Sequence, residues 1–374
     1  MISKAVLVAN RTHPVYGSAR VTLDLAQGFH EQGLDVRVIT YEGVAELNKN
    51  TLPEGVDHTH IGTGPDDGIG RWPNLIRNLT RSLGKTDTEA VYVGVLTQAN
   101  LLLAITNFAS RRRRTTILTE HNTLSDTLRQ SSQRRRIVLR TLISLTYPRT
   151  RSIVSVSTAV MRDIRRNMAH PTARHAVVFN PIDTAALQRR ALHGESVLQI
   201  PHDVTMVACI AELKPAKNQT LLLRLLPHLP RYVHFALIGG GRDEGTLREL
   251  ADQIGVADRV HFLGHLPNPW PTVRQCAASI LVSQYEGYGL VAAESAAIGV
   301  MPIGVPVGGL AEVLEAVGGI QLIQSSIPRM ADDIMHALGQ TSSWTPTRAL
   351  DWLQSYAPDA VAHRYLDLVP DETA

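Results

Sequence analysis

Short apolar runs rich in β-branched residues alternate with longer, helix-like segments along almost the whole chain. The first runs lie at residues 5–9, 34–40 and 90–95, and residues 18–32 between the first two carry apolar side chains at helical spacing. Apolar strands joined by helical crossovers indicate a parallel sheet that is covered on both faces. The alternation therefore predicts an α/β fold.

The strand-like runs form two series, separated at residues 184–203 by a stretch without a clear period, which is typical of a linker. The first series continues with strands expected at residues 116–119, 152–156 and 177–179. The second series has strands expected at residues 204–210, 233–238, 260–263, 278–282 and 301–304, and helices at 218–226 and 242–254. Two such series predict two Rossmann-like, doubly wound parallel-sheet domains that face each other across a cleft.

Composition narrows the class of protein further. Charged residues make up 19% of the 374 residues, which excludes a disordered chain. The two cysteines, Cys209 and Cys276, lie in apolar runs without ligand spacing, which excludes a disulfide scaffold and a cysteine-based zinc module. Because the N-terminal apolar run is too short for a signal peptide and no stretch resembles a membrane-spanning helix, we expect a cytoplasmic chain.

Positive charge is concentrated in the first half of the sequence. Residues 1–190 hold 26 Lys or Arg against 15 Asp or Glu, whereas residues 191–374 hold 11 against 19. Two clusters stand out, and they consist of Arg111, Arg112, Arg113 and Arg114, and of Arg134, Arg135 and Arg136.

The second cluster leads into an apolar, helix-like stretch at residues 137–147. Such a patch attracts anionic lipid head groups or an anionic acceptor, and it would place the chain peripherally at the inner membrane face. A solvated face over an ordinary core helix is the alternative. Nucleic acid is not expected, because aromatic residues are only 5% of the chain and do not interleave with the arginines.

Glycines follow several of the predicted strands, among them Gly17, Gly239 and Gly289. A helix N-terminus with a bare backbone presents N–H groups and a partial positive charge to an anion, so several such turns favour a phosphate-rich ligand. Glu286 and Glu294 lie on either side of a glycine turn and a helix start. Ionised carboxylates only accept hydrogen bonds, which suits the hydroxyls of a sugar or a ribose.

Taken in order, these segments resemble the retaining glycosyltransferases of family four, which have the two-Rossmann, type-B fold. The segment from Glu286 to Glu294 resembles the family's Glu-x7-Glu signature, and residues 237–247 resemble its Gly-x-Gly strand-to-helix segment. Residues 260–264 resemble the strand before its nucleotide-base loop, and residues 119–122 its histidine-bearing strand end. The resemblance covers nearly the whole chain.

The resemblance implies transfer of a sugar, hexosyl or N-acetylhexosaminyl, from a nucleotide sugar to an acceptor hydroxyl with retention of the anomeric configuration. It implies no metal or other cofactor at the donor diphosphate. Residues 1–185 would form the acceptor-side domain and residues 186–354 the nucleotide-sugar-binding domain, with a final helix at about 355–374 that packs back on the first domain. The implied acceptor is a glycan, a lipid-linked sugar or an anionic polymer in glycolipid, polysaccharide or cell-envelope synthesis.

The resemblance also assigns site residues. The implied catalytic residues are Glu286, in contact with the donor sugar, and His121, near the reacting centre. The implied donor-binding residues are Gly17, Ser18, Lys214, Lys217, Gly239, His265, Tyr288, Gly289, Leu290 and Glu294. Since no second carboxylate pair for a double displacement is evident, a front-face departure of the leaving phosphate is the preferred mechanism.

The chain departs from the family's pattern at Glu212, where an arginine often follows the strand. The neighbouring Lys214 is the candidate replacement for that positive charge. Two other functions therefore stay open, namely a non-catalytic nucleotide-sugar-binding protein and a sugar-nucleotide epimerase on the same scaffold.

Overall fold

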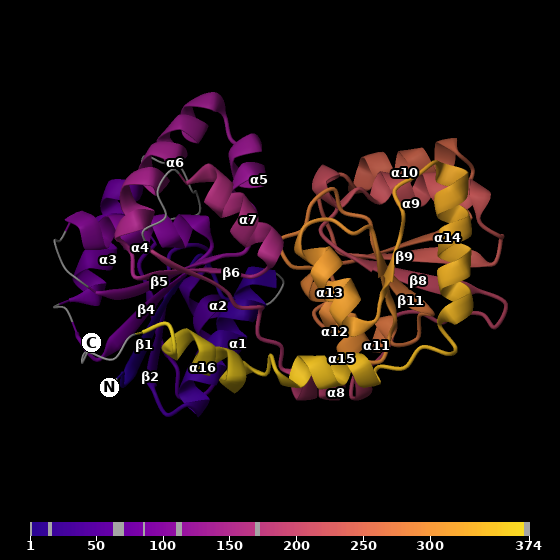
Figure 1. Ribbon diagram of the computed structural model, residues 1–374. Coiled ribbons are helices and arrows are strands. Elements are labelled where there is room, and N and C mark those ends of the chain that lie inside the picture. Colours follow the sequence, from indigo (N-terminus) through magenta and orange to yellow (C-terminus); the bar gives the residue numbers. More distant parts are fainter. Residues whose placement is uncertain are drawn as a thin grey trace. The chain divides into compact units, whose positions relative to one another are not determined.

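The computed structural model describes residues 2–13, 17–62, 71–84, 87–109, 114–168 and 173–369. The chain divides into two compact units, Met1–Ile182 with Tyr356–Ala374, and Asp183–Ser355. Each unit is built on a parallel sheet flanked by helices (Figure 1). The predicted fold class, two Rossmann-like doubly wound domains, is confirmed.

The first unit holds a seven-stranded sheet in the order β3-β2-β1-β4-β5-β6-β7. Its strands are β1 (Lys4–Ala9), β2 (Asp35–Thr40), β3 (Asp57–His60), β4 (Ala90–Val95), β5 (Thr115–Glu120), β6 (Ser152–Ser155) and β7 (Arg174–Val177). Its helices are α1 (Gly17–Glu31), α2 (Ala45–Lys49), α3 (Trp72–Leu83), α4 (Thr97–Ala109), α5 (Leu124–Arg129), α6 (Gln133–Thr146), α7 (Thr158–Asn167) and α16 (Pro358–Leu366). The strand order reverses between β1 and β4.

The second unit holds a six-stranded sheet in the order β10-β9-β8-β11-β12-β13, which reverses between β8 and β11. Its strands are β8 (Thr205–Ile210), β9 (Val233–Ile238), β10 (Val260–Gly264), β11 (Ala278–Leu281), β12 (Pro302–Gly304) and β13 (Ile320–Gln321). Its helices are α8 (Thr184–Leu192), α9 (Gln219–Leu225), α10 (Glu244–Gln253), α11 (Trp270–Val273), α12 (Leu290–Ala297), α13 (Gly309–Val317), α14 (Ile327–Gln340) and α15 (Thr347–Gln354).

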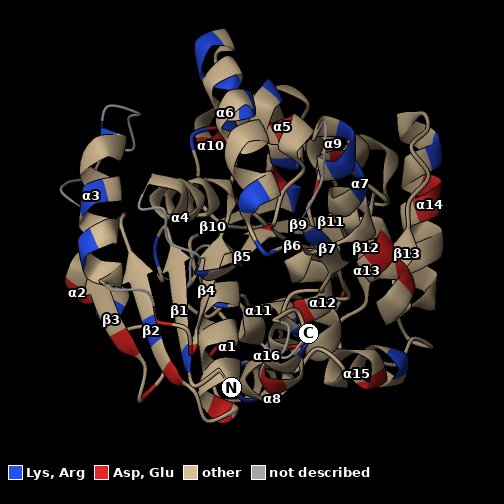
Figure 2. Ribbon diagram, turned by 60° about the vertical axis from the view of Figure 1, so that its left-hand side comes forward, with Lys and Arg blue, Asp and Glu red and all other residues tan. Residues whose placement is uncertain are grey.

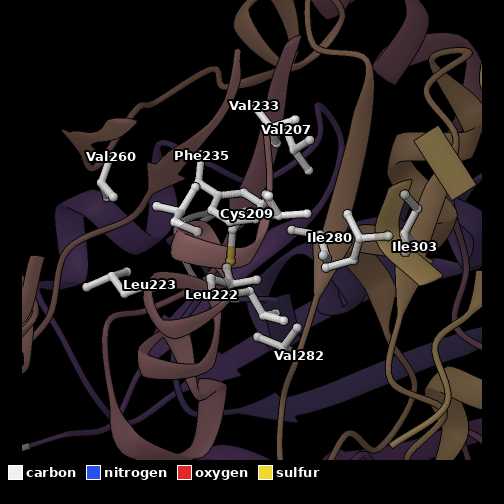
Figure 3. Close-up of a cluster of buried hydrophobic side chains, with 14 of the residues drawn as sticks. Val207, Cys209, Leu222, Leu223, Val233, Phe235, Val260, Ile280, Val282 and Ile303 are labelled. Atoms are coloured by element: carbon white, nitrogen blue, oxygen red, sulfur yellow. The ribbon is translucent and has the colours of Figure 1, made fainter. Parts of the chain in front are cut away.

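The core of the second unit lies between its sheet and the covering helices. Val207 and Cys209 on β8 and Phe235 on β9 are buried together with Leu222 and Leu223 of α9 (Figure 3). Cys209 and Cys276 are both buried free thiols, as expected for small apolar residues in a core. None of the helices within the described ranges is long and apolar enough to cross a membrane.

The helix α16 returns to the first unit and packs on α1. Tyr365 of α16 meets the ring of Phe29 edge-on at a centroid distance of 6.2 Å, and its hydroxyl lies 3.1 Å from Thr119 Oγ1 of β5. At Gly28 of α1, a Cβ atom would come within 2.0 Å of the carbonyl oxygen of Pro358, so the two helix backbones are in direct contact. Residues 370–374 lie outside the described part of the chain.

Some of the elements differ from the expectation. The strand expected at residues 177–179 is β7, Arg174–Val177, and the strands β3 and β13 were not expected. All three are edge strands with a single neighbour, so they lack the continuous apolar run that marks a strand buried on both faces.

The stretch at residues 184–203, expected to be a linker, begins with the helix α8. Asp183 caps this helix by accepting a hydrogen bond from the Ala186 amide at 2.8 Å. Leu187 and Ala191, one turn apart, are buried and anchor it.

Candidate functional site

Two loops meet at the carboxyl ends of β8 and β11, where the strand order of the second unit reverses. The loop after β8 contains the 3-10 turn Pro215–Lys217, and the loop after β11 contains Glu286. The amide of Gln284 donates a hydrogen bond to the carbonyl oxygen of Ala216 at 2.9 Å, which joins the loops. Ligands of doubly wound sheets bind at such a reversal point.

Lys217 and Glu286 form an ion pair across these loops. Lys217 Nζ lies 2.5 Å from Glu286 Oε1, and Ser283 Oγ donates a hydrogen bond to the same oxygen at 2.8 Å. Both side chains of the pair are mostly buried. The structure thus brings two of the predicted site residues into direct contact and presents an ammonium group and a carboxylate together. These groups suit phosphate and hydroxyl partners respectively.

The Glu286 loop is held by close backbone contacts. Gly309 N, at the start of α13, donates a hydrogen bond to the carbonyl oxygen of Glu286 at 3.0 Å. Gly308 has a φ of +55°, and a Cβ atom there would lie 2.0 Å from the same carbonyl oxygen. Only glycine fits this position, so the Gly308–Gly309 turn fixes where Glu286 sits.

The next predicted residues begin the helix α12. Gly289 has a φ of +93° and precedes Leu290, the first residue of the helix. The first N–H groups of a helix have no acceptor within it, so this terminus offers donors and a partial positive charge. Glu294 lies in the same helix, and both Glu294 and Tyr288 are buried.

The other glycine-rich turn of this unit has a packing role. Gly239 has a φ of +140°, and a Cβ atom there would lie 2.1 Å from the carbonyl oxygen of Ala211. Its amide donates a hydrogen bond to Gly264 O at 2.8 Å. Close approach of neighbouring backbones therefore accounts for Gly239. His265 follows β10 and is exposed, and β9 separates its strand from β8.

Lys214, the candidate replacement for the missing arginine, is paired with the acid that stands in the arginine's place. Its Nζ lies 2.6 Å from Glu212 Oε2, and both side chains are exposed. Gln219 Nε2 donates a hydrogen bond to the carbonyl oxygen of Glu212 at 3.0 Å. The positive charge of Lys214 is thus partly offset by Glu212 before any anion arrives.

His121 follows β5 in the first unit and is buried. Burial lowers its pKa to about 4, and a hydrogen bond with Asn180 opposes that shift. The ring is therefore neutral near pH 7, and its Nε2 is a buried polar atom without a hydrogen-bond partner among the described residues.

A buried carboxylate that we did not predict lies next to this histidine. Glu120 accepts hydrogen bonds from Thr97 Oγ1 at 2.6 Å, from Asn100 Nδ2 at 2.9 Å and from the Tyr147 hydroxyl. Burial raises the pKa of Glu120, and these three donors oppose the rise. Leu96, between β4 and α4, has a φ of +79°, which is strained for leucine. In the sequence, the only indication of this network was the pair Glu120-His121 at the end of the strand.

A second unpredicted network joins strand ends near the start of α1. Arg11 donates to Glu42 at 2.6 Å, and Glu42 is buried. When the Gln98 amide is oriented with its nitrogen towards Glu42 and its oxygen towards Arg135, it donates to Glu42 at 3.3 Å and accepts from Arg135 at 2.8 Å. The predicted residues Gly17 and Ser18 begin α1, and residues 14–16 before them lie outside the described ranges.

Of the first arginine cluster, the structure describes only Arg114. Arg111, Arg112 and Arg113 lie outside the described residues. The expectation that Arg114 contacts a membrane or an acceptor is wrong, because it is buried and donates to Asn107 Oδ1 at 3.1 Å and Gly84 O at 3.0 Å.

In the second cluster, only one arginine faces solvent. Arg136 Nε donates to the Leu128 carbonyl oxygen at 3.0 Å, and Arg135 is turned towards Gln98. Arg134 is exposed. Of the described arginines in the two clusters, Arg134 is therefore the one placed for a surface contact.

Curated relatives match parts of the chain. A 4-α-N-acetylgalactosaminyltransferase from Campylobacter jejuni, named for its N-acetylgalactosamine-N,N'-diacetylbacillosaminyl-diphospho-undecaprenol substrate, is 24% identical over 221 residues. The match covers 59% of this chain and 58% of that protein. The D-inositol 3-phosphate glycosyltransferase of Mycolicibacterium smegmatis is 34% identical over 153 residues, which are 39% of this chain and 35% of that protein. The chain thus spans less than two thirds of either relative.

Solved structures share the fold over nearly the full length. Anabaena HepE, crystallised in complex with UDP and glucose, superposes with a TM-score of 0.76 at 18% identity, covering 97% of this chain and 98% of that chain. The family described as Glycosyltransferase Family 4 matches residues 15–186, and the family described as Glycosyl transferases group 1 matches residues 195–343. The chain therefore belongs to the family-4-type glycosyltransferases with the two-Rossmann, type-B fold.

Proposed function

We propose that this protein transfers a sugar, hexosyl or N-acetylhexosaminyl, from a nucleotide sugar to an acceptor hydroxyl, with retention of configuration and without a divalent metal. The observation that carries the proposal is the Lys217–Glu286 pair at the reversal point of the second sheet, beside the start of α12. HepE, which has the same fold, was crystallised with UDP and glucose, and this supports a nucleotide-sugar donor.

The donor diphosphate would lie against Lys217 and the first amides of α12. These groups are fixed before the reaction, so they stabilise the negative charge that develops on the leaving diphosphate without reorganisation. Glu286 would accept a hydrogen bond from a hydroxyl of the donor sugar, and the buried Glu294 one from the ribose. Lys217 and the helix terminus thus supply the positive charge that a metal ion provides in other transferases.

Retention follows if the acceptor oxygen attacks the anomeric carbon from the face that the diphosphate leaves. The bond from the anomeric carbon to the phosphate oxygen breaks, the bond to the acceptor oxygen forms, and the acceptor proton passes to the departing phosphate oxygen. This route needs positioning and charge stabilisation, not a protein nucleophile. Neutral His121, near the reacting centre, would help to position the donor sugar.

For the acceptor we propose a glycan, a lipid-linked sugar or an anionic polymer of glycolipid, polysaccharide or cell-envelope synthesis. The names of the relatives support this class, because they include a diphospho-undecaprenol-linked substrate and inositol 3-phosphate. The first unit, residues 1–182 with 356–374, holds 25 Lys or Arg against 18 Asp or Glu, and this positive excess attracts such phosphate-bearing acceptors. We propose that the protein works in the cytoplasm, at the inner membrane face.

Release of nucleoside diphosphate tests the transfer. The protein is incubated with UDP-, GDP- and ADP-sugars and a panel of acceptors in the presence of EDTA, and the anomeric configuration of the product is read by NMR. We expect release from one donor class and a retained configuration. Release that requires added metal, or solvent exchange at the sugar ring without release, would contradict the proposal, and the second result would favour an epimerase.

The pair itself is tested by Lys217→Gln and Glu286→Gln. Each change should lower kcat/KM by about a hundredfold or more, since each removes a preorganised contact to the reacting groups. Glu244→Gln is the matched control, because Glu244 pairs with Arg248 on the exposed face of α10 in the same unit. Wild-type turnover in either site variant would show that the site is elsewhere.

A further inference from the structure

The helix α6 carries large apolar side chains on its solvent side. Ile137 is 60% exposed, Val138 40% and Leu145 51%. Phe108, near the end of α4, is 56% exposed, and the guanidinium carbon of Arg149 lies 5.3 Å from its ring centroid. These four are among the nine large apolar residues exposed in the described chain, so exposure of this kind is concentrated here.

The exposed residues of α6 lie on one face. At 3.6 residues per turn, Arg134, Ile137, Val138 and Leu145 fall on the same side of the helix. The opposite side carries Leu139, Ile143 and Thr146, which are buried against the unit. One side of the helix therefore already packs on the unit. The exposed apolar side chains lie outside this packing.

The charge of α6 has one sign. The helix contains Arg134, Arg135, Arg136 and Arg140 and no Asp or Glu, and Figure 2 shows Lys and Arg along it. Arg135 and Arg136 bond inward, whereas Arg134 and Arg140 are exposed. The exposed Arg149 follows the helix. Cations beside exposed apolar side chains, with no acid between them, are typical of a helix that lies in a membrane interface.

We propose that the outer face of α6, formed by Arg134, Ile137, Val138 and Leu145 with Arg140 beside them and Phe108 of α4 near its end, docks on an anionic lipid bilayer. The apolar side chains enter the boundary of the acyl chains, and the arginines contact phosphate head groups. Charge complementarity identifies the partner as an anionic bilayer. A neutral surface would contact the apolar side chains of this face but would offer no opposite charge to its arginines. The proposal rests on the proposed function in one respect: docking would bring the acceptor-side unit to a lipid-linked acceptor.

Vesicle co-sedimentation of the full chain tests the docking face. We expect the protein to bind phosphatidylglycerol–phosphatidylcholine vesicles at low salt and pure phosphatidylcholine vesicles at least about tenfold more weakly. The double variants Ile137→Ser with Leu145→Ser, and Arg134→Gln with Arg140→Gln, should each lose about tenfold in binding. The matched control is Arg162→Gln with Arg166→Gln, which removes the same charge from exposed positions on α7 of the same unit.

Three results would overturn the docking proposal. They are no binding to anionic vesicles, an equal loss of binding in the α7 control, and a lipid-free dimer in sedimentation velocity that the Ile137→Ser, Leu145→Ser variant abolishes. The last would assign the face to a second copy of the chain. Diphosphate release with a soluble acceptor should be unchanged in all the surface variants, so failure of docking and failure of the transfer reaction are measured separately.

Discussion

The Glu212–Lys214 pair is a site where this chain departs from the pattern that it resembles. An acid stands where an arginine is common, and it holds the ammonium of Lys214 at 2.6 Å. The consequence for a phosphate ligand is twofold, because one positive charge is missing and the neighbouring one is partly offset. Under the proposed function, the donor diphosphate would therefore rely on Lys217, which is itself paired with Glu286, and on the first amides of α12.

Replacing Glu212 by Gln should strengthen binding of a nucleoside diphosphate by a few-fold. The change removes a negative charge beside the proposed phosphate site and releases Lys214. Because both side chains are exposed, the gain should shrink as salt is added. Isothermal titration calorimetry at low and high salt measures both effects. Glu249→Gln, an exposed acid on α10, is the control, and weaker binding by the Glu212 variant would contradict this interpretation.

His121 should make stability depend on pH in a defined window. Its pKa is about 4 in the folded chain, below the ordinary 6.5, so the unfolded chain binds the extra proton first. Stability from this group is complete above about pH 6.5 and is lost as the pH falls towards 4. Between about pH 7 and about pH 5 the loss should be about 2 kcal/mol.

Urea unfolding at these two pH values, for wild type and His121→Gln, measures that loss. The variant should lack about 2 kcal/mol of the pH dependence. His175, whose pKa burial also lowers to about 4, is present in both proteins and cancels in the comparison. Identical pH dependence in the two proteins would mean that His121 is not buried as a neutral ring.

Among the elements, α1 and α16 are in close backbone contact at Gly28. A Cβ atom at Gly28 would lie 2.0 Å from the Pro358 carbonyl oxygen. Relieving this overlap would require the backbone of α1 or α16 to shift, because no flexible side chain can move aside. Gly28→Ala should therefore lower the free energy of unfolding by about 1–3 kcal/mol and expose α16 to proteolysis.

Gly339→Ala is the matched control for this junction. Gly339 lies in α14, where a Cβ atom meets nothing within 4 Å, so alanine there should be neutral or slightly stabilising. Chemical denaturation and limited proteolysis of the two variants measure the difference. Equal stability of Gly28→Ala and wild type would show that α16 is not seated on α1 in solution.

The inner strands and the edge strand β10 were predictable from sequence, whereas the edge strands β3 and β7 were not. Strands buried on both faces, such as β4 and β8, consist of unbroken apolar runs. At the edge, β3 reads Asp-His-Thr-His and has no such run. The helix α8 was missed because its single buried side leaves a weak period, and the cap at Asp183 is a local feature that a search for apolar runs does not detect.

The candidate site was predictable where its residues are local in sequence. Glu286, Gly289 and Glu294 lie within one short motif. Glu120 was not identified, because its partners Thr97, Asn100 and Tyr147 come from other elements and meet it only in the folded sheet.

The arginine cluster shows the same limit. Charge alone did not show that Arg135 and Arg136 bond inward while Arg134 faces solvent. Side-chain direction along a helix is set by what the helix packs against, and a run of like residues does not reveal it.

Across the chain as a whole, the two units divide the proposed work. The first carries the basic excess, the neutral His121 and the outer face of α6. The second carries the Lys217–Glu286 pair and the start of α12. Family membership, the two sheets and the two reversal points are consistent with this division. The proposed function depends on binding of a nucleotide diphosphate by the second unit through Lys217, without metal.

Calorimetric titration of the full-length protein with UDP-, GDP- and ADP-sugars in EDTA tests this binding most directly. We predict that the wild type binds one of these donor classes and that Lys217→Gln binds it at least about tenfold more weakly, since a charged contact to phosphate is lost. Absence of binding by every donor, or equal affinity of the wild type and the Lys217 variant, would contradict this prediction.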